Sequence, residues 1–546
     1  MENQTEKKIK KQKSGKLYAN MIQLILVGCV TGIFVGTVVT FFAIAAEKGE
    51  EIARDTYAYV RNNPAFIPLL LAALCAGAFL LGVALRISTI AKGCGIPQAE
   101  GATRGIVRFK WWSDAITMFA SSLMSIFLGL SIGSEGPSVL IGACLGDGVA
   151  TTLRRNEMVK RYQITGGAST GLAVASNAPL TGIVFAFEEA HKRFTPEVFI
   201  CSFTSVILGV LTRTVIYSLL DMPMHSAFHL YVLNELPPSQ YWYVAIAGIV
   251  CGVLGVLFFK ACFGVRRLFK KIKTKSHHKN ESVRIFIAVL IGGLLSLVTA
   301  GVMGGGHGLI ERLGTMGGAD LQHDVRVYGL PIVASLAVIV LLKTLVTTVN
   351  VGSGIPCGIF VPIIAIGACL GALMNRLFAK MGMDSAYFDV MVLICMASFF
   401  ATVVRAPLTA VIMVFEFTMA SGNAGSFSSL LPIALGVAIG YFIGEVSRTD
   451  GIYEELLEVY ERENGIHERA VKELYTFDVA HGSIADKREV RDILWPSGAR
   501  VVEIWRGDEH ILPAGDTVIH GGDKITIMCK TDEPKKTRDD LAHIVE

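Results

Sequence analysis

Residues 131–146 read SIGSEGPSVLIGACLG, and residues 356–371 read PCGIFVPIIAIGACLG. The string IGACLG therefore occurs twice, 225 positions apart, and in both places it follows a proline at the same distance. A second pair, NAPLT at 177–181 and RAPLT at 405–409, is 228 positions apart, and a glutamate follows each, at Glu188 and Glu416. These matching offsets predict two structural halves. In membrane transporters such halves are often inverted, with the binding site at their interface.

Glycine- and proline-rich breaks interrupt the apolar sequence in three places: GCGIP at 93–97, GSEGP at 133–137, and GSGIP at 352–356 running into GIFVP at 358–362. Proline is favoured in the first turn of a helix, so each break can begin a helix. A helix that begins inside a membrane presents unpaired N–H groups and a partial positive charge at its N-terminus. Three such N-termini predict a weak site for a small anion, as conduction requires. The alternative is that the glycines serve only helix packing.

The composition places most of the chain in a bilayer. Of its 546 residues 52% are hydrophobic and 18% are charged, and the mean hydropathy is +0.52. Soluble proteins carry about 25% charged residues. Residues 451–546 hold 34 of the 96 charged residues, so the charges concentrate in the last part of the chain. This distribution excludes a soluble enzyme, a disordered chain and a nucleic-acid binder. It predicts an all-α polytopic membrane protein with broken intramembrane helices, followed by a small α/β domain.

Four segments are expected along the chain: a basic cytoplasmic N-terminal segment (1–18), a transmembrane transport domain (19–460), a linker (461–474) and a cytoplasmic domain (475–546). The apolar run from Met21 to Ala46 is long enough to span a membrane, so we interpret it as a retained first helix. Basic clusters at 7–16, 154–161 and 266–279 should face the cytoplasm, which predicts a multi-pass protein of the cell membrane with both termini in the cytoplasm. The eleven cysteines show no metal or disulfide spacing, and we expect no cofactor.

Glu135 is the first candidate for function, because an ionisable residue inside a membrane segment is a functional hypothesis by default. When deprotonated it mimics an anion and can occupy a site at a helix N-terminus. When protonated it loses that attraction and can swing away, which makes proton binding and anion binding mutually dependent. The alternative is an acidic residue that only caps the helix.

These motifs resemble those of the CLC family of chloride channels and chloride/proton exchangers, which has the stretches GSGIP, G(K/R)EGP and GxFxP and a late tyrosine. The matching stretches here are GCGIP, GSEGP and GIFVP, with Tyr453 in DGIYEELLE, and the resemblance covers about residues 20–460. It implies a homodimer with one pore per subunit, inverted halves, and Glu135 as the external gate. The anion-binding residues that it implies are Cys94, Gly95, Ser134, Glu135, Gly136, Ile359, Phe360 and Tyr453.

The resemblance also bears on the ion and on the transport mode. Cys94 stands where chloride-selective members usually have serine, and a thiol is a weaker donor than a hydroxyl. The substrate is expected to be chloride, since an intact GIFVP argues against the fluoride-exporting branch. Members that exchange protons carry an acid at the position of Glu189, which accepts protons from the cytoplasm. Glu189 therefore favours an exchanger over a passive chloride channel, whereas Glu416 is expected to be structural.

Other functions are weighed against transport. GASTG at 167–171 fits the serine-nucleophile pattern GxSxG, but its small-residue surroundings are typical of helix packing, so we do not expect an enzyme. His307 lies in the glycine-rich turn 304–308 and is expected to be structural. A membrane-anchored ligand sensor remains a distant alternative, although an anchor would need neither the three breaks nor Glu135.

The tail contains alternating strand patterns at 501–505 and 525–528 and a short helix near 535–545. It resembles the C-terminal RCK (TrkA-C) domain, a regulatory module of potassium transport proteins. This implies dimerisation and a small cytoplasmic ligand, or a purely structural dimer module.

Overall fold

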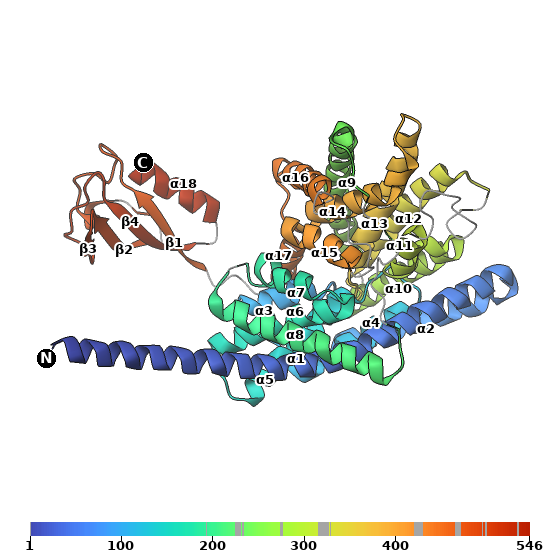
Figure 1. Ribbon diagram of the computed structural model, residues 1–546, viewed down its shortest axis with the longest axis horizontal. Helices are drawn as coiled ribbons and strands as arrows, with labels where there is room; N and C mark the ends of the chain where they lie inside the picture. Colours follow the sequence, from blue (N-terminus) through green and yellow to red (C-terminus); the bar gives the residue numbers. More distant parts are fainter. Residues whose placement is uncertain are drawn as a thin grey trace. The chain divides into compact units, whose positions relative to one another are not determined.

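A computed structural model shows a large helical unit and a small mixed unit (Figure 1). It describes residues 2–192, 194–223, 231, 234–272, 277–314, 327, 329–419, 430–464, 471–493, 495–496, 499–531 and 534–546. The chain divides at Leu457/Glu458 into unit 1 (Met1–Leu457) and unit 2 (Glu458–Glu546). Part of the predicted basic cluster (273–276) and part of the predicted linker (465–470) lie outside the described residues.

Unit 1 is helical throughout its described part. Its helices are α1 (Glu2–Asn62), α2 (Ile67–Ile87), α3 (Ile96–Thr103), α4 (Trp111–Phe127), α5 (Glu135–Thr152), α6 (Glu157–Ser176), α7 (Pro179–Phe185), α8 (Pro196–Leu219), α9 (Tyr241–Lys270), α10 (His277–Val298), α11 (His307–Gly314), α12 (Ile332–Ser353), α13 (Phe360–Ala379), α14 (Phe388–Val404), α15 (Pro407–Met419), α16 (Leu430–Val446) and α17 (Ile452–Asn464), the last of which continues into unit 2.

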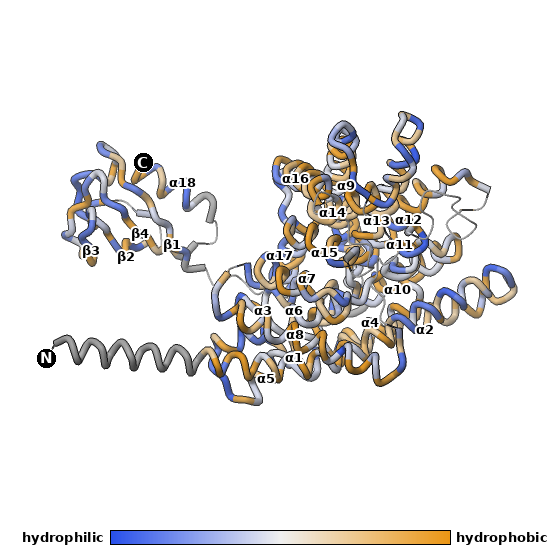
Figure 2. The backbone as a smooth tube through the Cα atoms, in the orientation of Figure 1, coloured by the Kyte–Doolittle hydropathy of each residue, from blue (hydrophilic) through white to orange (hydrophobic). Residues whose placement is uncertain are grey.

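Eight helical segments of the described part are long and apolar enough to cross a membrane. They include Met21–Asn62, Pro64–Ile87 and Pro238–Lys270. Hydrophobic residues run along these helices in Figure 2, and many large apolar side chains lie exposed on their outer faces, as a lipid-facing surface requires. The protein is therefore a multi-pass membrane protein. Several other helices are too short to span, among them α3 and α7, as the breaks in the sequence predicted.

The repeated IGACLG strings mark two equivalent helix pairs. In the first half, Gly142 and Gly146 of α5 lie against the backbone of α6 at Gly167 and Gln163. In the second half, Gly367 and Gly371 of α13 lie against the backbone of α14 at Met396 and Val392. Any side chain larger than hydrogen would push each pair apart, which is the small-residue mode of packing in membranes. The repeat in the sequence is thus a repeat in the structure.

The two halves also cap each other's helices. The carboxylate of Glu188 accepts hydrogen bonds from the backbone N–H groups of Leu408 (2.8 Å) and Thr409 (2.6 Å), at the N-terminus of α15. The carboxylate of Glu416 accepts equivalent bonds from Leu180 and Thr181, both at 2.8 Å, at the N-terminus of α7. Each glutamate satisfies the orphan donors of the other half's helix, and this reciprocity relates the halves by a pseudo-two-fold axis. The structural role predicted for Glu416 is confirmed.

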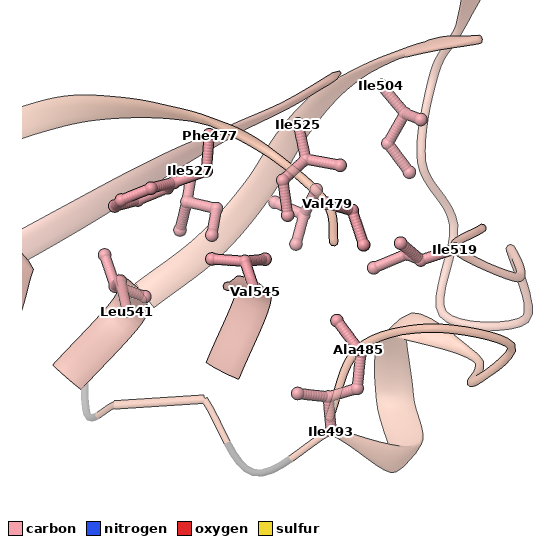
Figure 3. Close-up of a cluster of buried hydrophobic side chains, with 11 residues drawn as sticks. Phe477, Val479, Ala485, Ile493, Ile504, Ile519, Ile525, Ile527, Leu541 and Val545 are labelled. Carbon is pink, nitrogen blue, oxygen red and sulfur yellow. The ribbon is translucent and has the colours of Figure 1, made fainter. Parts of the chain in front are cut away.

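Unit 2 is a four-stranded antiparallel sheet with one helix. Its strands are β1 (Val471–Asp478), β2 (Ala499–Arg506), β3 (Glu509–Ile511) and β4 (Lys524–Thr531), in the order β1-β4-β2-β3, and its helix is α18 (Pro534–Val545). Figure 3 shows Leu541 and Val545 of α18 facing Ile525 and Ile527 of β4, with Phe477 beside them. The predicted strands lie within β2 and β4 and the predicted helix is α18, whereas β1 and β3 were not predicted.

An ion pair between the half-buried Arg506 and the buried Asp523 joins β2 to the turn before β4. The guanidinium of Arg506 donates to both carboxylate oxygens of Asp523, at 2.9 and 2.8 Å, and the backbone N–H of His520 donates to Asp523 Oδ2 at 2.8 Å. Burial of the Asp523 carboxyl acts to raise its pKa, but the bonds from Arg506 and His520 outweigh this, so its pKa lies below the usual range. Asp523 therefore stabilises the folded unit only while it is ionised.

Acidification should consequently lower the stability of unit 2. A depressed pKa contributes stability that is present above the unfolded value of about 3.9 and is lost as the pH falls through the folded value. We expect Asp523→Asn to lower the stability of unit 2 at neutral pH by about 1 kcal/mol and to remove the share of its pH dependence below about 4 that Asp523 contributes. Hydrogen exchange of β4 peptides in the full chain, compared between variant and unmodified protein at each pH, measures this. Equal protection in the two proteins at every pH would contradict it.

Candidate anion site

The three glycine- and proline-rich breaks meet at one place in unit 1. Gly133 and Gly358 form an antiparallel bridge, in which the N–H of Gly133 donates to the carbonyl of Gly358 at 2.7 Å. The N–H of Cys357 donates to the carbonyl of Gly93 at 3.0 Å, which ties the first break to the third. Gly133 and Gly358 are equivalent residues of the repeat, 225 positions apart, so the pseudo-two-fold axis passes between them. The meeting point is the interface of the halves.

Helices α3, α5 and α13 all begin at this meeting point, with Gly95, Ser134 and Ile359 as their N-cap residues. The first N–H groups of each helix have no partner within the helix. The backbone N–H groups of Ile96 and Ile359 are directed at the sulfur of Cys94. Donors from two helix N-termini thus converge beside one side chain, in a region where Cys94, Ile359 and Phe360 are all buried.

Glycine is required for this approach. Gly95 has φ +91°, and a Cβ atom there would lie 2.5 Å from the carbonyl oxygen of Gly136. A Cβ on Gly136 would collide with the carbonyl of Cys94 and lie 2.9 Å from the Cα of Gly358. The backbones of all three breaks are therefore in direct contact, and side chains at these positions would separate the helix N-termini.

Glu135 lies in the first turn of α5 and is fully buried. Its Oε1 accepts a hydrogen bond from the Ser134 hydroxyl at 3.4 Å and lies 2.9 Å from Nε2 of His307. Its Oε2 is buried and has no hydrogen-bond partner among the described residues. The side chain thus points into protein and not toward lipid. A buried carboxylate oxygen without a donor is costly, so Glu135 is a candidate functional group.

Tyr453, near the start of α17, is also fully buried, and its hydroxyl has no hydrogen-bond partner in the described part of the chain. Cys94 and Glu135 are both within electrostatic range of this hydroxyl. An O–H group without an acceptor is a donor available to an anion. The structure therefore brings together the eight residues predicted for the anion site, although they come from four segments of the chain.

Glu188 and Glu189 lie on a short π-helical turn (Ala186–Ala190) that follows α7. Single π turns inside helices are frequent at functional sites. The turn points the two carboxylates to different surroundings, with Glu188 on the N-terminus of α15 and Glu189 buried in unit 1. Of the predicted acidic pair, Glu188 therefore caps α15, whereas Glu189 does not contact that helix N-terminus.

Glu189 lies beside a cluster of charged side chains, within electrostatic range of Glu100, Lys192 and Glu454. The ammonium of Lys192 bridges Glu100 and Glu454, at 2.9 Å to each, and Arg104 pairs with both carboxylates as well. Lys192 and Glu454 are partly exposed, whereas Glu100 and Glu189 are buried. Partly exposed charged groups thus lie within electrostatic range of the buried Glu189.

Residues 76–445 match the family model described as voltage gated chloride channel, which is more than half of the chain. The chain belongs to the voltage gated chloride channel family. Residues 474–542 match the TrkA-C domain, so the family resemblances predicted for both units are confirmed.

Relatives and solved structures agree with this assignment to the voltage gated chloride channel family. The chain is 30% identical to the H(+)/Cl(−) exchange transporter ClcA of Vibrio cholerae serotype O1 (strain M66-2), over 80% of this chain and 89% of that protein. It is 28% identical to ClcA of Yersinia pestis bv. Antiqua (strain Angola), over 73% and 80%. The fold is similar to that of a slow cyanobacterial Cl−/H+ antiporter, with a TM-score of 0.69 at 23% identity, over 81% of this chain and 99% of that one.

Sequence reasoning missed part of the polar surroundings of this family member. His307 was interpreted as structural, yet its side chain is hydrogen-bonded to that of Glu135. Glu100 and Lys192 were not singled out, although both lie in sequence close to residues that were: Glu100 follows GCGIP, and Lys192 follows Glu189. Proximity to a motif was the available signal for these two, whereas no local signal joins His307 to Glu135, 172 positions away.

Ser169, the serine of the GxSxG pattern, is fully buried in α6. Its neighbours Gly167 and Gly171 lie against the backbone of α5 at Gly142 and Ser138. The pattern thus belongs to a helix-packing face, and the serine lies on no strand-to-helix turn of the kind that exposes a nucleophile.

Proposed function

We propose that this protein exchanges chloride for protons across the cell membrane as a secondary active transporter, with Glu135 as the gate that both ions share. The observation that carries this is the position of Glu135, a buried carboxylate in the first turn of a helix that begins where three intramembrane breaks meet. The relatives named as H(+)/Cl(−) exchange transporters support the same reading.

Chloride would bind to partial positive charge without meeting a full cation. Backbone N–H groups at Ser134, Gly136, Ile359 and Phe360 belong to the N-termini of α5 and α13, whereas the N–H of Gly95, at the start of α3, donates to Oε1 of Gln98 at 3.0 Å. The Tyr453 hydroxyl and the Cys94 thiol add side-chain donors. A lysine or arginine at this place would hold a halide too tightly for release, whereas dipoles allow the ion to enter and leave.

Glu135 would couple the two ions by competition. When it is ionised, its carboxylate is itself an anion beside the helix N-termini and competes with chloride for the same donors. When it takes up a proton, that attraction falls and the side chain can leave the site, so chloride enters. One side chain that alternates between these states links the movement of a proton to the movement of chloride in the opposite direction.

Glu189 would pass protons between the cytoplasm and Glu135. Replacing it with glutamine should leave chloride flux within about a factor of three and reduce proton flux by at least about tenfold, since the amide keeps the shape but does not carry a proton. Proton and chloride fluxes measured together in reconstituted vesicles test this.

Glu188→Gln is a matched control for that variant, because it makes the same change one residue away. Its carboxylate oxygens cap α15, so we expect a loss of about 1 kcal/mol in stability while the ratio of proton to chloride flux stays the same. If Glu188→Gln and Glu189→Gln lowered proton flux alike, the proton route through Glu189 would be wrong.

The assembly and its orientation are part of the proposal. We propose a homodimer with one pore per subunit and with both termini in the cytoplasm, the side that basic clusters favour. The TrkA-C domain would then face the cytoplasm and bind a small ligand there. No cofactor is needed, because chloride and protons are the only species that move.

The deciding experiment is uphill proton transport. Purified protein in sealed vesicles should move protons against their gradient when a chloride gradient is applied, and the protons should follow chloride in a fixed ratio. If chloride flows but protons never move against their gradient, the protein is a passive chloride channel of the same fold.

A further inference from the structure

A glycine-rich loop places His307 beside Glu135, the proposed gate. His307 is the first residue of α11, and its Nε2 lies 2.9 Å from Oε1 of Glu135. The two side chains differ in access, since the His307 side chain is 38% exposed and the Glu135 side chain is 1% exposed. The imidazole therefore stands between solvent and a carboxylate that solvent does not reach.

The backbone conformation of the loop before His307 requires glycine. Gly304 and Gly306 have φ values of +59° and +108°, which disfavour other residues. A Cβ on Gly305 would lie 3.1 Å from the Cα of Gly133, so the loop packs directly on the GSEGP break. The loop thus fixes the histidine against the same backbone that carries Glu135.

Charged groups from two further elements, and from α11 itself, surround this pair. From α1, Glu50 lies against Gly304 within electrostatic range of His307, with Glu47 and Arg54 nearby. From α12, the buried ammonium of Lys343 lies 3.2 Å from the carbonyl of Gly304 and within range of Glu50. From α11 itself, Arg312 is within range of Lys343. Two carboxylates, Glu50 and Glu135, therefore flank one imidazole.

We propose that His307 is the proton relay and positioning residue of Glu135, so that protons pass between the solution on that side and the gate through its imidazole. This rests on the proposed function. In the inward step, Nδ1 takes a proton from water, and Nε2 gives its own proton to Oε1 of Glu135, so one proton enters and one is delivered. The ring is left neutral with its proton on Nδ1. After the protonated Glu135 side chain has left, a hydronium ion protonates Nε2 and a water molecule takes the proton from Nδ1. This restores the starting tautomer with no net gain or loss of protons, and the Glu50 carboxylate stabilises the cationic intermediate.

The test replaces the relay but keeps the hydrogen bond. His307→Gln can still donate to Glu135, yet an amide does not pass protons on. We expect its coupled transport to match that of the unmodified protein at about pH 5, where protons are abundant, and to be roughly tenfold slower at about pH 8. His510→Gln, an exposed histidine of unit 2 paired with Glu503, controls for the loss of a histidine elsewhere.

A double variant separates a relay from a merely structural role. In Glu135→Gln, chloride flux no longer depends on the gate's proton, so adding His307→Gln should leave chloride flux and its pH profile unchanged. A further tenfold loss in the double variant would show that His307 acts on the fold and not through Glu135, and would overturn the proposal. So would a His307→Gln profile identical to that of the unmodified protein while that protein still moves protons uphill. If the unmodified protein moves no protons uphill, the proposed function itself fails.

Discussion

Glu135→Gln should abolish proton coupling while chloride continues to flow. Glutamine is close to glutamate in shape but stays neutral, so it neither competes with chloride as an anion nor carries a proton. We expect a large effect because Glu135 is fully buried at the point where the halves meet, and its Oε2 has no hydrogen-bond partner among the described residues. We expect proton flux to fall by about a hundredfold or more, into the background of protein-free vesicles.

Paired recordings of chloride and proton flux in vesicles measure this effect. Glu51→Gln makes the same chemical change at an exposed site on α1, where Glu51 pairs only with Lys48 at 2.9 Å in the described structure, and it should leave both fluxes unchanged. Continued uphill proton transport by Glu135→Gln would show that another group carries the proton and would remove the basis of the shared gate.

Gly358→Ala should weaken chloride binding by displacing the backbone, without removing any side-chain donor. The added methyl group would collide with the carbonyl oxygen of Gly133 and lie 3.0 Å from Cδ of Pro137. Neither neighbour can rotate away, since one is main chain and the other is a ring in the first turn of α5. Relief requires the N-termini of α5 and α13 to separate, and overpacking of this kind costs about 1–3 kcal/mol. Chloride affinity should therefore fall by at least about tenfold.

Calorimetric titration of chloride into the purified protein measures this affinity. Gly264→Ala is the matched control, because Gly264 lies within α9 with nothing inside 4 Å of its Cβ direction, so the same substitution should be harmless there. Unchanged chloride affinity in Gly358→Ala would mean that the contact between the two breaks does not form the site.

The amino-acid sequence alone was sufficient for the membrane body and the two halves, whereas the anion-site residues were predicted from the resemblance to a family. These properties can be seen directly in the sequence, as apolar composition over long runs, as glycine and proline at helix starts, and as a string repeated at a constant offset. The same local chemistry predicted strands β2 and β4 and helix α18, since alternation and helical periodicity are visible over a few residues.

The tertiary structure decided which of these residues meet. Glu188 and Glu189 are neighbours in sequence with the same chemistry, and only the π turn and the position of α15 assign one to capping and leave the other buried. His307 and Glu135 lie 172 positions apart, and a glycine loop folded onto the GSEGP break joins them. The physical reason is that helix starts and hydrophobic runs depend on interactions within a few residues, whereas the pairing of buried charges depends on how distant backbones pack.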